Sequence, residues 1–404
     1  MDDEHRHDEG QHAHGSTVEA RGPVQPAHGR VVDDHAGPGQ GGRDAVGHYF
    51  DHGIPLLNEY GTSTRPVRPR GRCYNRRPLS GPVKTLPTLP GPRTVILAGD
   101  IGGTNARFGC YADGERVGVA ELDAEAFPNG EELLAAALAE LPPRTIDACC
   151  LAVAGPVFGD EAKLTNIDIA FSRTGIEAAT GASAVALVND MVALGSAVSG
   201  LPDDRFELLS GEPRDGVKCV LAAGTGLGMV VVADGKCLPS EGGHARIAPV
   251  GAFERELISF SESEVELHGG VLAWEHYLSG RGVEALYRAV CAVWGAKPEW
   301  FDAERITRRG LAVEDPVCHT TVETWAGMLA TAAGGLAVTS LSFGGVYLGG
   351  SIPVAVAEFL RGALFRRRFE DAAWAADYLK EIPIYLVADP LAGLDGAHLI
   401  AAER

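Results

Sequence analysis

Two glycine-rich turns, each lying between two apolar runs, contain the residue types that bind phosphate. The first is Asp100-Ile-Gly102-Gly103-Thr104-Asn105, and the second is Gly224-Thr225-Gly226-Leu-Gly228. Glycine admits positive φ angles and close approach of phosphate oxygens, so that successive backbone amides can converge on one anion. Because the pattern occurs twice, with an acid leading the first copy, we expect phosphate binding rather than two purely structural turns.

Neither turn matches the common nucleotide fingerprints. The chain has no GxxxxGK[ST] P-loop, and the GxGxG of the second turn is followed by Met229–Ala233, which favours a strand. A dinucleotide fingerprint requires GxGxxG followed by a helix. The sequence therefore disfavours a nicotinamide site.

Acidic and imidazole side chains supply candidate groups for proton transfer and for binding hydroxyls. Asp190 follows an apolar run and stands beside Asn189, where a carboxylate can accept a hydroxyl proton. The alternative is that Asp190 caps a helix at Met191–Ser199. Glu241-Gly-Gly-His244 is short and glycine-flexed, so that both side chains can face one ligand.

Together these stretches resemble, in order and spacing, the bacterial glucokinase family of the sugar-kinase/actin-like ATPase superfamily. The resemblance covers about residues 93–404, and no single motif would suffice for it. It is carried by Asp100–Arg107, by Ala154-Gly-Pro-Val157 with Thr165-Asn166, by Val188-Asn189-Asp190, by Ala223–Gly228, by Glu241-Gly-Gly-His244 and by Leu348-Gly349-Gly350-Ser-Ile-Pro353.

The resemblance implies phosphorylation of D-glucose by ATP at the C6 hydroxyl, with Asp190 as the general base. Asp100 would position Mg²⁺ through water, because Mg²⁺ keeps most of its own waters. The implied sugar ligands are Asn166, Asn189, Glu241, His244 and Glu275. The implied ATP-binding residues are those of the two turns together with Gly349 and Gly350, which would lie beside the adenosine.

Simpler roles remain open for three of the implied sugar ligands. Asn166 could form an Asx turn, His244 could be a core histidine and Glu275 could be a solvated helix charge. Two other positions depart from the family pattern. Arg246 stands where an acid is frequent, and Asp395 stands where Gly or Ser is usual. Both bear on affinity and sugar selectivity.

Two other activities stay open for a chain of this pattern. One is phosphorylation of another hexose, and the other is a non-catalytic sugar sensor of the same fold. A sensor-repressor would need an N-terminal winged helix, and residues 1–90 show no helical period.

The elements that must position these groups follow a strand–helix rhythm. Each glycine turn lies in a strand–turn–strand unit that ends in Asp-Gly, a strong hairpin signal. We predict strands at Ile146–Val153, Ala184–Val188, Val346–Leu348 and Ile382–Val387, and helices at Glu131–Leu141, at Leu272–Trp294 with a Ser-Gly-Arg-Gly break, and at Thr321–Leu341. Ligand groups gather at the carboxyl ends of strands in such α/β proteins.

The predicted fold is two actin-like (ribonuclease H-like) α/β domains with a cleft between them, preceded by a disordered N-terminal tail at 1–92. The smaller domain would comprise 93–200 and 386–404, including the last strand and helix. The larger domain would comprise 201–385. Sugar binding should close the cleft and exclude water.

The composition limits which partners the protein can have and indicates the compartment in which we expect it. The net charge of the 404 residues is −19, and residues 1–90 carry equal numbers of basic and acidic groups, so the excess acid lies in 91–404. This argues against nucleic acid as a partner, and no apolar run reaches the roughly 18 residues of a membrane span. The eight cysteines form no CxxC pair and no signal peptide precedes them, so we expect reduced thiols in a cytoplasmic protein. A homodimer is expected from the resemblance alone.

Overall fold

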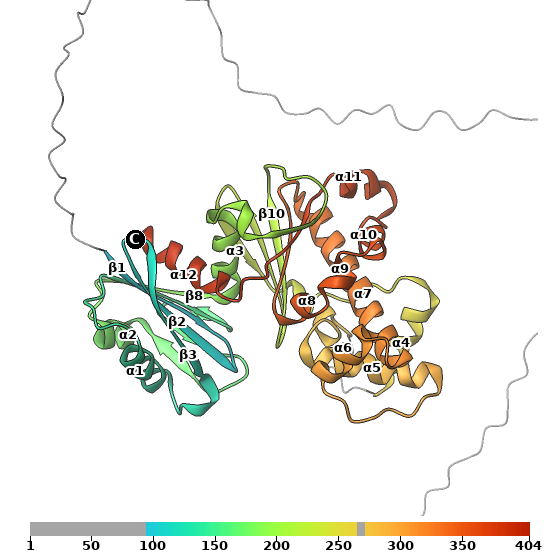
Figure 1. Ribbon diagram of the computed structural model, residues 1–404, viewed down its shortest axis with the longest axis horizontal. Coiled ribbons are helices and arrows are strands. Elements are labelled where there is room, and N and C mark those ends of the chain that lie inside the picture. Colours follow the sequence, from blue (N-terminus) through green and yellow to red (C-terminus); the bar gives the residue numbers. More distant parts are fainter. Residues whose placement is uncertain (1–93, 265–270) are drawn as a thin grey trace, which may run out of the picture. The chain divides into compact units, whose positions relative to one another are not determined.

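The computed structural model describes residues 94–264 and 271–404, which belong to one compact unit delimited at Lys84–Arg404 (Figure 1). The disordered tail predicted at 1–92 lies outside the described residues.

A five-stranded mixed sheet is built from the first hundred described residues. Its order is β3-β2-β1-β4-β8. The strands are β1 Val95–Ile101, β2 Asn105–Ala112, β3 Glu115–Asp123, β4 Ala148–Val153 and β8 Ala184–Asn189. β2 is antiparallel to β1 and β3, whereas β1, β4 and β8 run parallel. Strand β4 is buried along its whole length, as expected of a parallel strand covered on both faces.

A second, six-stranded sheet has the order β12-β11-β10-β13-β14-β9. Its strands are β9 Glu207–Ser210, β10 Lys218–Ala223, β11 Leu227–Ala233, β12 Lys236–Ser240, β13 Gly345–Gly349 and β14 Ile384–Leu386. From β12 to β14 the sheet repeats the order and the strand directions of the first sheet. The predicted pair of related α/β units is therefore confirmed.

Strand β14 corrects one expectation. The last strand was predicted in the smaller domain, but it pairs in parallel with β13 and so belongs to the second sheet. Only the final helix returns to the first sheet. The domain boundaries at 200 and 386 otherwise remain predictions.

Two tight turns explain why each glycine-rich loop is followed by a hairpin. Asp113-Gly114 joins β2 to β3 with φ angles of 55° and 84°, and Asp234-Gly235 joins β11 to β12 with 51° and 72°. Two successive residues with positive φ define the hairpin turn that matches strand twist, and Asp-Gly adopts it readily. Both predicted hairpins are confirmed.

The helices surround the two sheets (Figure 1). The α-helices are α1 Gly130–Glu140, α2 Arg173–Thr180, α3 Asp190–Gly200, α4 Gly251–Glu264, α5 Gly280–Trp294, α6 Ala303–Leu311, α7 Pro316–Ser340, α8 Ser351–Ala355, α9 Ala357–Leu360, α10 Ala363–Phe369, α11 Ala376–Lys380 and α12 Ala392–Ala402. The 3₁₀ turns are η1 Ala124–Ala126, η2 Asp203–Arg205, η3 Gly242–His244, η5 Trp274–His276 and η6 Ala373–Ala375. A small sheet of β5 Val157–Phe158, β6 Glu161–Lys163 and β7 Ala170–Ser172 was not predicted.

Alternate residues of the strands divide the core between two layers. Leu97 and Ile101 of β1 pack on the side of α1 and α2, whereas Ile96 and Ala98 pack on the side of α12. Helix α3 packs against β10, β11 and β12 of the second sheet. Helices α3 and α12 lie side by side, and Gly396 of α12 abuts the backbone of α3. These two helices therefore join the two sheets.

Two predicted helices differ from their observed limits. Helix α7 begins at Pro316, earlier than expected, because the Asp315 side chain caps it and proline suits the first turn. The predicted helix before the Ser-Gly-Arg-Gly break is only the η5 turn. The break itself starts α5, because the Ser279 hydroxyl accepts the Gly282 N–H at 3.1 Å as a helix cap.

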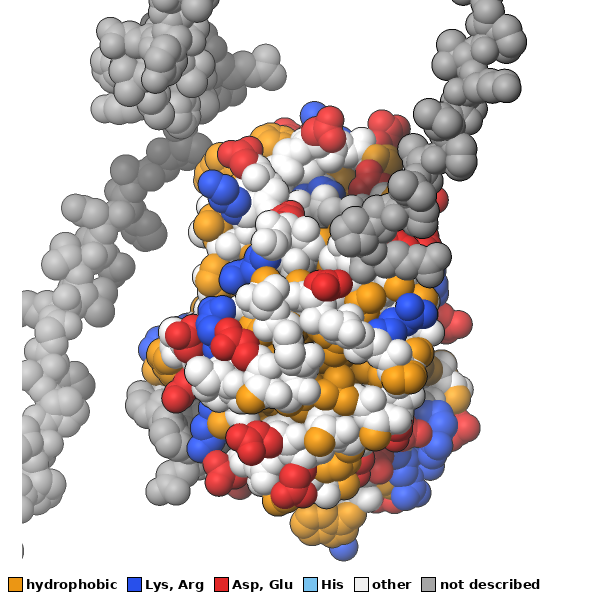
Figure 2. Space-filling model, turned by 90° about the vertical axis from the view of Figure 1, so that its left-hand side faces the viewer, with side chains coloured by type: hydrophobic (Ala, Val, Ile, Leu, Met, Phe, Trp, Pro, Cys, Tyr) orange, Lys and Arg blue, Asp and Glu red, His pale blue; other side chains and the backbone are white. Residues whose placement is uncertain are grey.

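The surface and the thiols agree with the composition. Figure 2 shows acidic and basic side chains interspersed on one face of the molecule. In the described ranges, no helix is long and apolar enough to cross a membrane. The seven cysteines in those ranges are all free thiols, and Cys73 lies outside them.

Candidate active site

Asp100 and Asp190 meet at one edge of the first sheet. Asp100 lies near the end of β1, and Asp190 directly follows β8 as the first residue of α3. Because β1, β4 and β8 are parallel, their carboxyl ends share an edge. Both carboxylates line one cavity of about 540 Å³.

Both carboxylates have pKa values raised toward neutrality. Burial raises the pKa of Asp100 to about 6, against the opposing charge of Arg107. Burial and the charge of Asp100 raise the pKa of Asp190 to about 6, although hydrogen bonds from its neighbours oppose this. A carboxylate poised near neutrality can accept a proton from a hydroxyl as that hydroxyl reacts.

Asn189 rather than Asp190 is the cap of α3. Its Oδ1 accepts the Met191 N–H at 3.0 Å, and its Nδ2 donates to the Gly155 carbonyl at 3.2 Å. Asp190 Oδ1 also accepts the Met191 N–H, at 2.9 Å. Asn189 is thus the N-cap of α3, whereas Asp190 is the first residue of the helix and lines the cavity.

The first glycine turn is closed by its own backbone. The Gly102 N–H donates to the Asn105 carbonyl at 2.9 Å, and the Thr104 carbonyl accepts the Ala124 N–H at 2.8 Å. Gly103 lies against the Asn166 side chain, and Asn105 lines the cavity with the two aspartates. The structure therefore places the Asn166 side chain beside this turn.

The second glycine turn borders a second cavity, of about 780 Å³. The Gly224 N–H donates to the Gly226 carbonyl at 2.9 Å, and the Gly224 carbonyl accepts the Gly280 N–H at 2.8 Å. Gly224 and Thr225 line the cavity together with α6 and the start of α8. Gly350 lines the aspartate cavity instead, while Gly349 is buried beneath it.

The predicted sugar-binding segments converge on Leu227, the first residue of β11. The Glu275 Oε2 accepts the Leu227 N–H at 2.8 Å, and Gly243 abuts the Leu227 carbonyl. Backbone hydrogen bonds join 245–247 to 272–274 and so hold Glu241–His244 beside the Glu275 turn. His244 Nε2 lies 3.8 Å from Glu241 Oε2, and both side chains are exposed.

Gly228 connects these segments to the aspartates. It lies against the Met191 side chain, where a Cβ would have no room. Met191 follows Asp190 directly, so the strand that begins at Leu227 touches the start of α3. The strand that follows the second glycine turn thus contacts the helix that carries Asp190.

Several cavity residues were missed by the sequence predictions. Arg107 lines the aspartate cavity, and its Nη2 lies 2.7 Å from Glu121 Oε1. The sequence does contain the information needed to predict Arg107, because a hairpin about the glycine turn pairs position 107 with Asp100. Asp389 and Gly393 also line this cavity. Their place depends on the return of α12 to the first sheet, which no local pattern encodes.

Two sheets of one topology, each opening with a strand–glycine turn–strand unit, define an actin-like (ribonuclease H-like) α/β protein. The glucokinase family model matches residues 97–404. The chain is 37% identical over 314 residues to the glucokinase of Chromobacterium violaceum, covering 75% of this chain and 88% of that protein. It is 36% identical over 310 residues to that of Nitrobacter hamburgensis, covering 74% and 95%.

Solved structures agree with this assignment. A glucokinase from an Antarctic psychrotroph is 28% identical, with a TM-score of 0.67, and the match covers 77% of this chain and 99% of that one. The glucokinase of Balamuthia mandrillaris has the same fold, with 23% identity and a TM-score of 0.67 over 77% and 94% of the two chains. The chain belongs to the glucokinase family.

Proposed function

We propose that this protein is an ATP-dependent glucokinase, which converts ATP and D-glucose to ADP and glucose 6-phosphate. The observation that carries the proposal is the family match over 97–404, with relatives named glucokinase at 36–37% identity. The cavity shared by Asp100 and Asp190 supplies the carboxylates that the reaction needs.

Asp190 is the general base. As the C6 oxygen forms its bond to the γ-phosphorus, the bond from that phosphorus to the bridging oxygen of ADP breaks. The hydroxyl proton passes to Asp190, which holds it until product leaves. Little covalent chemistry is left for the protein, so alignment and charge neutralisation supply most of the rate.

The phosphates of ATP lie against the glycine turns. Backbone amides of 102–105 and 224–228 and the hydroxyls of Thr104 and Thr225 donate to them. The Arg107 guanidinium, on the same cavity wall as Asp100, neutralises further charge. Gly350 and the α6 side of the second cavity border the nucleoside.

Mg²⁺ fits this donor set. Two partly buried carboxylates face one cavity, and no group of three or more His, Cys, Asp or Glu gathers elsewhere in the described ranges. Mg²⁺ is commonly bound by one or two carboxylates together with water and substrate phosphates. Asp100 would hold it through water, and when bound it would neutralise the β- and γ-phosphate oxygens.

The hexose binds where the two sheets meet. Glu241, His244 and Glu275 accept from or donate to its hydroxyls from the second sheet, and Asn166 and Asn189 do so from the first. The Glu275 Oε2 accepts the Leu227 N–H, which leaves the other carboxylate oxygen to accept from a sugar hydroxyl. We also propose that the protein works in the cytoplasm as a homodimer.

A coupled assay with MgATP and a panel of hexoses tests the activity. We expect D-glucose to give the highest kcat/KM, with mannose, fructose and N-acetylglucosamine well below it. Release of ADP without glucose 6-phosphate, or no turnover of any hexose, would overturn the proposal. A preference for another hexose would retain the kinase and correct the substrate.

A further inference from the structure

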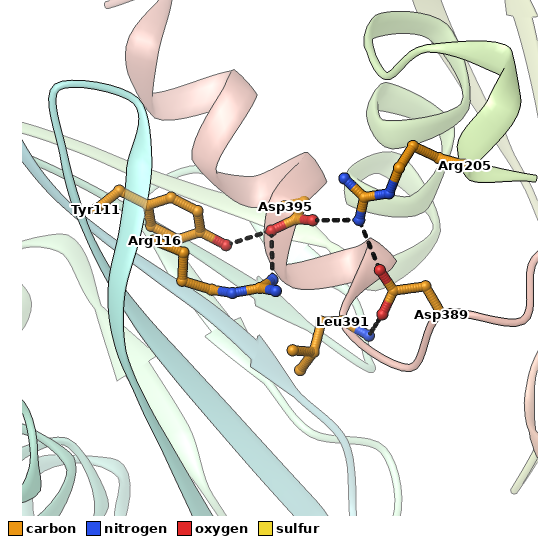
Figure 3. Close-up of polar contacts among 6 residues, drawn as sticks. All are labelled: Tyr111, Arg116, Arg205, Asp389, Leu391 and Asp395. Atoms are coloured by element: carbon orange, nitrogen blue, oxygen red, sulfur yellow. Dashed lines mark hydrogen bonds and ion pairs between the residues drawn. The ribbon is translucent and has the colours of Figure 1, made fainter.

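A buried carboxylate, Asp395, lies in the first turn of α12 and collects three charged or polar donors (Figure 3). The Tyr111 hydroxyl donates to Oδ1 at 2.6 Å and Arg116 Nη1 does so at 2.8 Å, while Arg205 Nη2 donates to Oδ2 at 3.1 Å. Only 8% of Asp395 is exposed. The two guanidinium groups supply the opposite charges that a buried carboxylate requires.

Arg205 extends this cluster to the segment that returns from the second sheet. The same Nη2 donates to Asp389 Oδ2 at 2.6 Å, and Asp389 Oδ1 accepts the Leu391 N–H at 2.9 Å (Figure 3). Arg205 lies in η2, where the chain leaves α3 for the second sheet. Asp389 lies between β14 and α12, where the chain comes back. Asp395 is thus tied to both crossings.

The same segment forms the wall behind Asp100. A Cβ placed on Gly393, in the first turn of α12, would lie only 2.7 Å from Asp100 Oδ2. Asp389 and Gly393 line the cavity that contains Asp100 and Asp190. The position of this turn therefore sets how far the Asp100 carboxylate can move.

We propose that Asp395 is a positioning residue for Asp100. Through Arg205 and Asp389 it holds the first turn of α12 in place, and Gly393 then limits the Asp100 carboxylate to one orientation. The inference rests on the proposed function, in which Asp100 holds Mg²⁺ through water. Asp395 itself does not line the cavity, so its effect passes through Asp100.

Four variants separate this role from general stability. D395N keeps the shape of the side chain and removes its charge. R205Q removes the ion pairs that Arg205 forms with Asp389 and Asp395. Because the Arg205 side chain is half-exposed, this change should affect folding little. G393A displaces Asp100 directly. E207Q is the control for loss of a neighbouring ion pair, because it removes one partner of the Glu207–Arg361 pair, 2.7 Å long, and neither residue lines the cavity.

Calorimetry of ADP binding, with and without Mg²⁺, is the measurement. We expect D395N, R205Q and G393A each to weaken binding of ADP with Mg²⁺ about tenfold, the lower end of losses on removing the support of a metal-holding group. Binding of ADP without Mg²⁺ and of glucose should change less than about twofold, and E207Q should change none of these. D395N combined with G393A should lose no more than either alone, because both act through Asp100.

Two results would overturn the inference. One is wild-type affinity for ADP with Mg²⁺ in R205Q and D395N. The other is multiplication of the losses in the double variant. D100N is the reference: if it binds ADP with Mg²⁺ as the wild type does, the role of Asp100 in the proposed function is wrong. If the wild type phosphorylates no hexose, the proposed function fails independently of Asp395.

Discussion

The environment of Asp190 lowers the stability of the fold and at the same time makes this carboxylate a better base. Asp190 is a carboxylate in a partly buried position, next to the second carboxylate of Asp100, and both effects raise its pKa to about 6. Such a group costs stability when it is ionised, since burial and a like charge disfavour the charged form. The same environment makes it a stronger base than a solvated aspartate.

Replacing Asp190 by asparagine should abolish most of the turnover while leaving the sugar bound. We expect kcat to fall by about 10²- to 10⁴-fold, the usual contribution of a general base. The glucose Kd, measured by calorimetry, should stay within about threefold. Turnover close to that of the wild type would contradict the base assignment.

The pH dependence should follow the raised pKa. Below about pH 6, Asp190 is protonated and cannot accept the hydroxyl proton, so kcat/KM for glucose should fall about tenfold per pH unit in acid. A profile that stays flat down to pH 4.5 would exclude a base of this pKa.

The ionisation of Asp190 that increases activity as the pH rises should decrease the stability of the fold. Because the folded-state pKa lies above the unfolded value of 3.8, the ionised side chain costs stability progressively as the pH rises from about 4 to about 6. D190N should therefore raise Tm at pH 7, and this gain should shrink toward pH 4. Scanning calorimetry at the two pH values tests the sign.

At the scale of elements, the contact between β11 and α3 fixes the position of the second glycine turn relative to Asp190. Gly228 leaves room for Met191, and Met191 follows the proposed base. A methyl group at position 228 would lie 2.4 Å from both Cγ and Sδ of Met191, in the middle of that side chain. Either the Met191 side chain must change its conformation or the start of α3 must shift.

G228A should consequently lower kcat about tenfold or more and also lower Tm, since overpacking of this kind commonly costs about 1–3 kcal/mol. G327A is the matched control, because Gly327 lies inside α7 with open space at its Cβ. That variant should keep full activity and gain about 0.5–1 kcal/mol from helix propensity. If G228A and G327A had the same kcat and the same Tm, the Gly228–Met191 contact would not be important for activity.

The elements that the sequence predicts are those with strong local signals. The paired hairpins follow from Asp-Gly turns, and β4 and β8 follow from apolar runs. Strand β9 and the small β5–β7 sheet are too short to show a period, and α6 is rich in charge. Among the site residues that were missed, Arg107 could have been predicted, because the first hairpin pairs it with Asp100. Asp389, Gly393 and the role of Asp395 depend on contacts between distant segments, so that no local pattern reveals them.

At the scale of the whole molecule, the catalytic part coincides with one compact unit. That unit begins at Lys84, and the family match begins at residue 97. Every residue in the proposed chemistry lies within it. The net charge of −19 also arises from residues 91–404, although a neutral sugar and MgATP need no such field.

A chain that starts at residue 84 should therefore retain the activity. We expect its kcat and its KM for glucose and ATP to match those of the 404-residue protein within about twofold, and its Tm to stay within a few degrees. Steady-state kinetics and scanning calorimetry of the two purified chains provide the comparison. A large loss of turnover would show that residues 1–83 contribute to catalysis.

The ion pairs of Arg205 also have a mechanical consequence. The chain passes between the sheets twice, at η2 and at the segment before α12, and one guanidinium fastens these two passages together through Asp389 and Asp395. Two covalent connections joined at a common point form a pivot. The motion that such a joint leaves easiest is rotation of one sheet relative to the other, while separation of the two passages would require both ion pairs to break.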